Sequence, residues 1–439
     1  MNYHTSTILQ LKDLNLHFED IPSKEEIVKG ITSLVFHAKL TYAPTECPCC
    51  NAKQKGQIVK NGTRLSRITL MKVSGLPAYL ALRKQRYYCR SCCHSFTASS
   101  DIVASHCILS NRLKQAIMVE AAQPISAKMI ALMHHVSPPT VHRVISQAAS
   151  AIRQRPTSDL PQHLALDEFK SVKTAAGKMS LVCLDNTSHR LVDVLENRQN
   201  HSLVSYFTRF SFASRCKVET VSTDLFGPYI DLIPQLFPKA KIVLDRFHIV
   251  QGLNRTLNQY RVQVMNQQRT HHPKLYRKLK KHWRLLLVHQ EKLNSTHYHY
   301  SPGFYEWVTS QGIVDYLLDQ DQRLKDTYRL VHQLREALQD NDKELFFDRL
   351  NVACNLSLPQ PLRRFIRTLN RYRQFVENTF DYPTISNGPI EGINNKIKVL
   401  KRVAYGFSNF SHFRDRILLM TRLFEPEWSK KDYAMDSIA

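Results

Sequence analysis

The amino-acid sequence predicts a multidomain α+β protein, and three observations lead to this prediction. Six of the ten cysteines fall between Cys47 and Cys93, which marks a small metal-binding region. Residues 163–245 alternate short apolar runs with amphipathic stretches, whereas residues 251–380 show helical periodicity with almost no strand signal. A chain of 439 residues is also too long for one compact core, so roughly two to four domains are expected.

The charge balance indicates the class of partner. Lysine and arginine number 61 against 37 aspartates and glutamates, which gives a net charge of +24. Because the basic residues cluster, this excess favours a polyanionic partner, most commonly nucleic acid, over a merely basic surface. No window holds the ~18 continuous apolar residues of a membrane-spanning helix, and the N-terminus has acids where a signal peptide needs an apolar core. A cytoplasmic protein without a membrane partner is therefore expected.

Two cysteine pairs predict a zinc site. The segments CPCC and CRSC each contain a C-x-x-C pair, which places two thiolates about a tetrahedral Zn²⁺. In a reducing compartment such clustering indicates metal rather than disulfides. The predicted ligands of one structural zinc ion are Cys47, Cys50, Cys89 and Cys92. The neighbours that can displace one of these ligands are Cys49, Cys93 and His94.

The residues between the two pairs predict a β-ribbon. Thirty-eight residues separate Cys50 from Cys89, and the segments RLSRITLMKV and RKQRYYC in this gap have the composition of strands. A ribbon of two such strands brings the pairs together. Two coincidental turns are the alternative, which the occurrence of both pairs in one basic region disfavours. The residues available for DNA phosphates are Arg83, Lys84, Arg86 and Arg90.

The stretch ISAKMIALMHHVSPPTVHRVISQAAS, which starts at Ile125, predicts a helix-turn-helix. Ser126 can cap a helix that runs to about His134, and Ser137 with two prolines opens a second helix. The inner apolar positions are Ile130, Val136, Val141 and Ile145. The residues expected to face outward, toward DNA, are Thr140, His142 and Arg143. An ordinary helical hairpin is the alternative, but the preceding ribbon and the net charge favour DNA binding.

Residues 163–245 predict the element order β-β-β-α-β-α-β. HLALDEFK, MSLVCLDN, RLVDVLEN, KVETVSTD and AKIVLDRFH have the pattern of strands, and SLVSYFTRF and PYIDLIPQLF that of helices. This is the RNase H-like arrangement, in which the first and fourth strands are neighbours in the sheet. We therefore expect Asp167, on the first strand, and Asp224, at the end of the fourth, to lie side by side.

Two adjacent carboxylates attract hard divalent cations, because each carboxylate alone repels the other. A third carboxylate completes a site for two Mg²⁺ or Mn²⁺ ions, which stabilise the attacking and leaving oxygens in phosphodiester chemistry. Glu391 fits, because Pro389 can take the first helical position and place Glu391 in the first turn. The alternative role for either aspartate is that of an ordinary turn residue. The alternative role for Glu391 is to compensate the dipole of its helix. The set of three in this order favours the metal.

The helix that begins near Glu391 is otherwise basic. Its sequence, SNGPIEGINNKIKVLKRVAYGF, places Asn394 or Asn395 one turn after Glu391 and Lys398 two turns after it, along the same side. We expect this side of the helix to meet the DNA backbone. The predicted contact residues are Asn394, Lys398, Lys401 and Arg402.

At these residues the chain resembles the DDE insertion-sequence transposases of bacteria, most closely those of the ISL-three type. The resemblance covers nearly the whole chain, from CPCC and CRSC through the helix-turn-helix and LALDEF. Its longest and most specific segments are VSTDLFGPYIDLIPQLFPKAKIVLDRFH and SNGPIEGINNKIKVLKRVAYGF. The resemblance implies a catalytic triad of Asp167, Asp224 and Glu391.

The second aspartate of the triad has a rival in Asp245. Related transposases with a helical insertion carry a C/D-x-x-H signature after the second Asp, and Asp245 with His248 matches this signature. Strand order favours Asp224, since Asp245 follows the fifth strand. We therefore predict Asp224 as a metal ligand, with Asp245 and His248 as support of the site; a buried core histidine is the alternative for His248. Glu168 follows Asp167 and is expected on the opposite face of its strand.

The helical stretch of residues 251–380 is expected to form an all-α domain inserted before the Glu391 helix, as the resemblance implies. The segment KLYRKLKKHWRLLLVH, residues 274–289, has the pattern of one amphipathic helix, as does IVDYLLDQDQRLKDTYRLVHQLREAL, residues 313–338. We expect Lys278 and Lys281 to contact transposon-end DNA. Trp283 is expected in a core rather than stacked on an unpaired base.

These features divide the chain into predicted segments. They are a lead (residues 1–40), a zinc ribbon (41–100), a helix-turn-helix domain (101–155), the first part of an RNase H-like catalytic core (160–250), the all-α insertion (251–380), the C-terminal part of the core with the third acid (381–425) and a tail (426–439).

The predicted function is DNA transposition. The ribbon and the helix-turn-helix would recognise the terminal inverted repeats of an insertion sequence, and the acidic triad would cut each end to free a 3′-OH that attacks target DNA. Both ends must be held together, so a homodimer or larger assembly is expected. The alternatives are a DDE-type nuclease without strand transfer and a transposase-derived DNA-binding regulator without catalysis. The expected location is the bacterial cytoplasm, at the nucleoid when bound to DNA.

Overall fold

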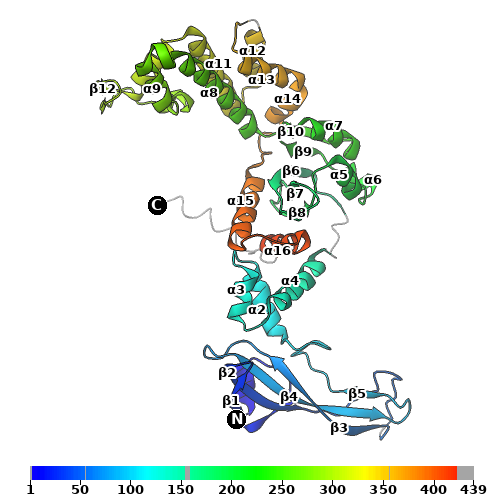
Figure 1. Ribbon diagram of the computed structural model, residues 1–439. Coiled ribbons are helices and arrows are strands. Elements are labelled where there is room, and N and C mark those ends of the chain that lie inside the picture. The colour runs from blue at the N-terminus through cyan, green and yellow to red at the C-terminus, as the bar shows by residue number, and fades with distance from the viewer. Residues whose placement is uncertain (1, 55, 154–158, 355, 423–439) are drawn as a thin grey trace, which may run out of the picture. The chain divides into compact units, whose positions relative to one another are not determined.

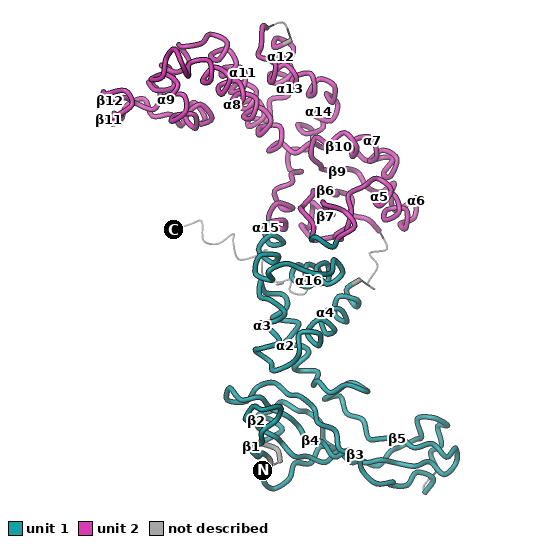
Figure 2. Tube along the Cα trace, viewed as in Figure 1, with its two compact units in different colours: residues 1–156, 172–174, 395–439 teal, residues 157–171, 175–394 magenta. Residues whose placement is uncertain are grey.

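The structure is a computed structural model that describes residues 2–54, 56–153, 159–354 and 356–422. The chain divides into two compact units: unit 1 comprises residues 1–156, 172–174 and 395–439, and unit 2 comprises residues 157–171 and 175–394 (Figure 2). The tail predicted for residues 426–439 lies outside the described residues. Both units mix helices with strands, which confirms the predicted multidomain α+β class. Within the described residues, we find no helix with the length and apolar character that crossing a bilayer requires.

Unit 1 contains a five-stranded β-sheet of order β1-β2-β4-β3, with β5 paired to β4 (Figure 1). Strands β3 and β4 pair antiparallel as the predicted ribbon, whereas β2 pairs parallel with β4. Two strands of the sheet therefore come from residues 1–40. The elements of this region are α1 (Asn2–Ile8), β1 (Leu16–Val28), β2 (Ile31–Leu40), β3 (Ile58–Thr69), β4 (Ala78–Cys89) and β5 (Ser95–Thr97).

Four helices form a second core in unit 1. They are α2 (Asn111–Ala121), α3 (Ala127–Met133), α4 (Pro138–Arg153) and, from the end of the described chain, α16 (Phe410–Arg422). The Ser126 side chain accepts a hydrogen bond from the Met129 N–H, so the predicted cap begins α3. Ile130, Val141 and Ile145 pack with Leu419 of α16 in one buried cluster. The helix pair is therefore covered on its apolar side.

Unit 2 contains the predicted strand-rich block. Its sheet has the order β10-β9-β6-β7-β8, and β6 pairs parallel with β9 from His163↔Thr220 to Ala165↔Ser222. The first and fourth strands of the block are thus neighbours, as expected. The elements are β6 (His163–Lys170), β7 (Met179–Asp185), β8 (Leu191–Leu195), α5 (Asn200–Phe207), α6 (Phe212–Arg215), β9 (Thr220–Thr223), α7 (Gly227–Leu236) and β10 (Lys241–Leu244).

The rest of unit 2 is helical apart from a small hairpin, and one hydrophobic cluster joins it to the sheet, from Leu164 of β6 through Leu253 to Leu369. The elements are α8 (Arg246–His271), α9 (Pro273–Lys281), β11 (His299–Ser301), β12 (Glu306–Val308), α10 (Ser310–Leu318), α11 (Gln322–Gln339), α12 (Lys343–Cys354), α13 (Gln360–Arg371) and α14 (Arg373–Asp381). Helix α15 (Gly388–Val403) begins in unit 2 and continues into unit 1.

Two helix predictions in this region were wrong in length. The helix predicted for residues 274–289 ends at Lys281 and gives way to a short 3₁₀ turn at Leu285–Leu287. The helix predicted for residues 313–338 is two helices, because the Asp321 carboxylate accepts a hydrogen bond from the Leu324 N–H and starts a new one. In both cases apolar residues continue at helical spacing across the break, so periodicity alone does not reveal it.

Candidate functional site

Four cysteines of unit 1 form a group that can hold a metal ion. The Sγ atoms of Cys47, Cys50, Cys89 and Cys92 all lie within 4.8 Å of one another. Two of the separations, Cys47 to Cys92 and Cys50 to Cys89, are 3.7 Å. Thiolates about 2.3 Å from a zinc ion at the corners of a tetrahedron are about 3.8 Å apart, so the geometry fits Zn²⁺.

Local backbone structure assembles this group. Cys89 ends β4, and its N–H donates to His94 O at 2.9 Å, which closes one knuckle. The Asn51 N–H donates to Cys47 O at 2.9 Å and closes the other. The Cys92 backbone N–H lowers the pKa of Cys89 to about 6, which favours the thiolate that binds metal. Cys49 and Cys93 are exposed and lie outside the group, as does His94.

Asp167 and Asp224 meet at the sheet of unit 2. Asp167 lies on β6, and Asp224 directly follows β9, its parallel neighbour. Both side chains line one pocket of about 100 Å³. The parallel pairing of the two strands therefore brings together two carboxylates that are far apart in the sequence.

The Asp167 carboxylate is half-buried and accepts hydrogen bonds from two sides. Asn394 Nδ2 of α15 donates to its Oδ2 at 2.7 Å, and the Glu168 backbone N–H donates to its Oδ1 at 2.7 Å. Burial raises the pKa of Asp167 to about 6 against the effect of the Glu168 N–H, and the charge of Asp224 raises it further. The charged form is thus costly here unless a cation compensates it.

His248 links Asp224 to Asp245. Its Nδ1 donates to Asp245 Oδ2 at 3.0 Å and lies 2.8 Å from Asp224 Oδ1. The carboxylate of Asp224, followed by that of Asp245, raises the pKa of His248 to about 10, so the imidazole is protonated at neutral pH. Asp245 is buried, and its Oδ1 accepts from the Asn387 N–H at 3.5 Å. The structure therefore places His248 beside Asp224 rather than in an apolar core.

Glu391 lies in the first turn of α15, as predicted. The start of this helix is tied to the sheet, since Ser222 of β9 donates to Asn387 Oδ1 and Asn394 donates to Asp167. Among the described residues, the cysteine group is the one set of three or more His, Cys, Asp or Glu within 4.8 Å. The carboxylates of Asp167, Asp224 and Glu391 are therefore farther apart than such a group.

Sequence reasoning missed a cluster around Glu168. Its side chain lines the same pocket as Asp167, where strand alternation predicted the opposite face. Glu168 Oε1 accepts from the Tyr229 hydroxyl at 2.6 Å, and Oε2 accepts from the Arg198 guanidinium, which also lies 5.1 Å from the Phe226 ring centre. These bonds from α7 and the loop before α5 draw the carboxylate toward the pocket. No sequence pattern signals Arg198, because its partners come from distant segments.

Two residues that were predicted to contact DNA contact other residues of the protein instead. His142 does not face outward, because its ring stacks on His412 of α16 with ring centres 4.5 Å apart. Asn394 is buried and donates to Asp167 instead of pointing to solvent. In both cases a partner from another part of the chain covers a face that the local helix pattern leaves open.

The other predicted contact residues have varied environments. Lys278 is half-buried, with Nζ 3.9 Å and 4.1 Å from the ring centres of Phe304 and Tyr316. Trp283 is half-buried beside Arg284 rather than in a core. The exposed members of the predicted set are Arg83, Arg86, Arg143, Lys281, Lys398 and Arg402. The remaining half-buried members are Lys84, Thr140 and Lys401.

Comparisons with known proteins point to one family. A model of the ISL3 type, described as a transposase, matches residues 164–417, and another, described as a zinc-finger of transposases IS204/IS1001/IS1096/IS1165, matches residues 43–92. The transposase for insertion sequence element IS1001 of Bordetella parapertussis is 23% identical over 399 residues, which cover 87% of this chain and 90% of that protein.

A second relative is similar over a shorter region. It is a Lactococcus lactis subsp. lactis protein named ATP-dependent protease, which is 36% identical over 112 residues, 26% of this chain. This chain covers 35% of that protein's length.

Proposed function

Since the chain belongs to the family of ISL3-type transposases, we propose that it cuts the ends of an insertion sequence and joins them to target DNA. The observation that carries this proposal is the meeting of Asp167 and Asp224, on neighbouring parallel strands, in one pocket of the matched region. We assign residues 160–250 and 381–425 to an RNase H-like catalytic core, interrupted by the insertion of residues 251–380. The other proposed boundaries are those of the lead (1–40), the zinc ribbon (41–100) and the helix-turn-helix domain (101–155).

The acidic site suits divalent cations. The carboxylates of Asp167 and Asp224 line one pocket, and burial disfavours the charge on Asp167 unless a cation compensates it. Carboxylate oxygens of this kind are the ligands that Mg²⁺ and Mn²⁺ prefer. Asp167, Asp224 and Glu391 would hold two such ions, which when bound stabilise negative charge on the oxygens of the scissile phosphodiester.

The surrounding residues position these carboxylates. Asn394 orients Asp167 through its 2.7 Å hydrogen bond, and the Asp245–His248 pair keeps the Asp224 carboxylate in place. The Arg198 side chain is 38% exposed at the pocket while Glu168 fixes its direction. In our proposal this guanidinium contacts a phosphate oxygen of the strand to be cut.

In this proposal unit 1 recognises the DNA ends, and basic residues of both units hold the DNA backbone. The zinc ribbon and the helix pair α3–α4 would bind the terminal inverted repeats, with Arg143 and Thr140 at the DNA. The basic residues of α9 and α15 would hold the phosphate backbone. A homodimer or larger assembly would bring two transposon ends together.

Incubating the purified protein with end-containing DNA and Mg²⁺ or Mn²⁺ tests the proposal. Cleavage followed by joining of the 3′ end to a target supports a transposase. Cutting without joining would identify a nuclease, and a mobility shift without cutting would identify a DNA-binding regulator. Either of the last two outcomes contradicts the proposed function.

A further inference from the structure

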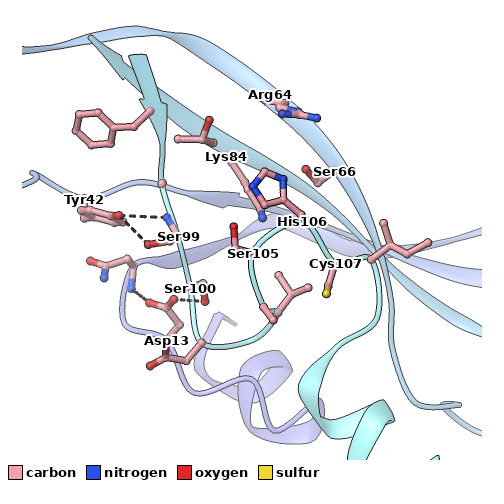
Figure 3. A pocket seen from close by; sticks show the side chains of 18 of the residues that line it. Asp13, Tyr42, Arg64, Ser66, Lys84, Ser99, Ser100, Ser105, His106 and Cys107 are labelled. Atoms are coloured by element: carbon pink, nitrogen blue, oxygen red, sulfur yellow. Dashed lines mark hydrogen bonds between the residues drawn. The ribbon is translucent and has the colours of Figure 1, made fainter. Parts of the chain in front are cut away.

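A large polar groove lies in the N-terminal β region of unit 1. It has a volume of about 1480 Å³, and strands β3 and β4 form one wall and residues 94–108 another. Arg64, Ser66, Lys84 and His106 are among the residues that line it (Figure 3). Most of its lining side chains are polar or charged, whereas sites for small molecules are mostly apolar and about 300–1,000 Å³ in volume. The groove therefore suits an extended polar ligand.

Two cations stand directly opposite each other on the wall of the groove. Arg64 of β3 and Lys84 of β4 are register partners in the antiparallel ribbon, so their side chains lie on the same face. Like charges in this position repel and destabilise a sheet. Lys84 is also half-buried, and burial, with the charge of Arg64 as a second cause, lowers its pKa. Both effects are relieved when an anion lies between the two side chains.

No described carboxylate within 4.0 Å neutralises this pair. Asp13, an acid that lines the groove, accepts hydrogen bonds from the Asn15 N–H and the Ser100 hydroxyl (Figure 3). The nearby Arg67 instead lies 3.7 Å from Glu26. The charge of Arg64 and Lys84 is thus left for a ligand.

The other donors in the groove favour phosphate oxygens. Hydroxyl groups of Ser66, Ser95 and Ser105 line it together with the imidazole of His106. Lysine, arginine and hydroxyl side chains are the groups that contact phosphates along nucleic acids. We propose that this groove binds the phosphodiester backbone of DNA, with Arg64 and Lys84 as paired phosphate contacts. The choice of DNA as ligand rests on the proposed function.

The test is the salt dependence of DNA binding by the full-length protein. The wild type and the double variant Arg64→Gln/Lys84→Gln are titrated with duplex end DNA at several salt concentrations. Each lost phosphate contact reduces the magnitude of the negative slope of log K against log salt by about 0.9, so the slope of the double variant should be shallower by about 1.8. The loss should be the same for end DNA and unrelated duplexes, because phosphate contacts carry no sequence information.

Three further variants serve as controls. Lys39→Gln removes one charge at an exposed position of β2 outside the groove and should leave the slope unchanged. Lys84→Arg keeps the charge and should also keep the slope. Loss of zinc or a changed circular dichroism spectrum would show that the double variant is misfolded. In that case the single variant Arg64→Gln, at an exposed position, replaces it, and its slope should be shallower by about 0.9.

The outcomes separate this inference from the proposed function. Suppose that the wild type binds and cuts ends, and that the double variant folds and keeps the same slope. This outcome overturns the proposed DNA contact in the groove but leaves the proposed transposase function standing. A wild type that binds no DNA overturns both. Loss of inorganic pyrophosphate binding in the double variant without a change in DNA slope would show that the groove takes a small anion, and also overturns the proposal.

Discussion

The cysteine group of unit 1 and the acidic site of unit 2 are assembled in different ways. Each cysteine pair spans one short turn, and a single antiparallel ribbon joins the pairs, so all four sulfur atoms lie within 4.8 Å of one another. The acids come from β6, the end of β9 and α15, and Asp167 and Asp224 share one pocket. Local turns suffice to place thiolates, whereas mutually repelling carboxylates depend on partners from the whole unit.

The largest expected effect comes from removing one ligand of the cysteine group. Cys89→Ala should abolish zinc binding and unfold the ribbon, because a structural zinc ion contributes on the order of 10 kcal/mol to the folding of a small domain. Metal analysis should find one zinc per chain in the wild type and none in the variant. Cys49→Ala is the matched control, since this exposed cysteine lies outside the group. Equal zinc loss in both variants would contradict the assigned ligands.

The next largest effect concerns the two candidate second aspartates. Asp224→Ala should reduce end cutting by about 1,000-fold or more, because it removes a ligand of ions that supply several kcal/mol of stabilisation. End binding, measured by mobility shift, should persist. The same outcome is expected for Asp167→Ala and Glu391→Ala. Full activity in Asp224→Ala beside a dead Asp245→Ala would reverse the choice of the second aspartate.

Asn394 tests whether the acidic site depends on its tertiary partners. Asn394→Ala removes the 2.7 Å hydrogen bond to Asp167 and should lower cutting by about 10- to 100-fold, the usual cost of losing a residue that orients a metal ligand. Val399→Ala, at an exposed position of the same helix, should cut normally. Equal cutting rates in the two variants would show that the bond does not orient Asp167.

The smallest expected effect is a dependence on pH. Because the pKa of Asp167 is raised to about 6, its carboxyl group holds a proton below that pH, and a metal ion must displace this proton to bind. The affinity for Mn²⁺ should therefore fall as the pH decreases below about 6, by up to about tenfold per unit, and level off above it. Calorimetric titration between pH 5 and pH 8 measures this. A constant affinity over that range would mean that Asp167 is ionised throughout.

Much of the fold could be predicted because its signals are local. The C-x-x-C spacing identified the four clustered cysteines, and Ser126 caps α3 as expected. The strand pattern also predicted that β6 and β9 are neighbours. The breaks between helices could not be predicted in this way, because the cap at Asp321 interrupts an apolar pattern that continues on both sides.

The direction of individual side chains could not be predicted in the same way. Glu168 was expected away from Asp167, yet Tyr229 and Arg198 draw it to the same pocket. His142 stacks on His412, and Asn394 bonds to Asp167, although both were expected to meet DNA. Each of these partners is contributed by a segment remote in the sequence.

The sequence by itself determined the zinc ligand spacing, the order of the strands and the family. These depend on residues close together in the chain, where spacing and hydrophobic period decide the outcome. Only the tertiary structure decided that Asn394 donates a hydrogen bond to Asp167 and that Arg64 and Lys84 line one groove. The reason is physical: buried charges must find hydrogen bonds or opposite charges, and folding, not sequence distance, brings those partners within reach.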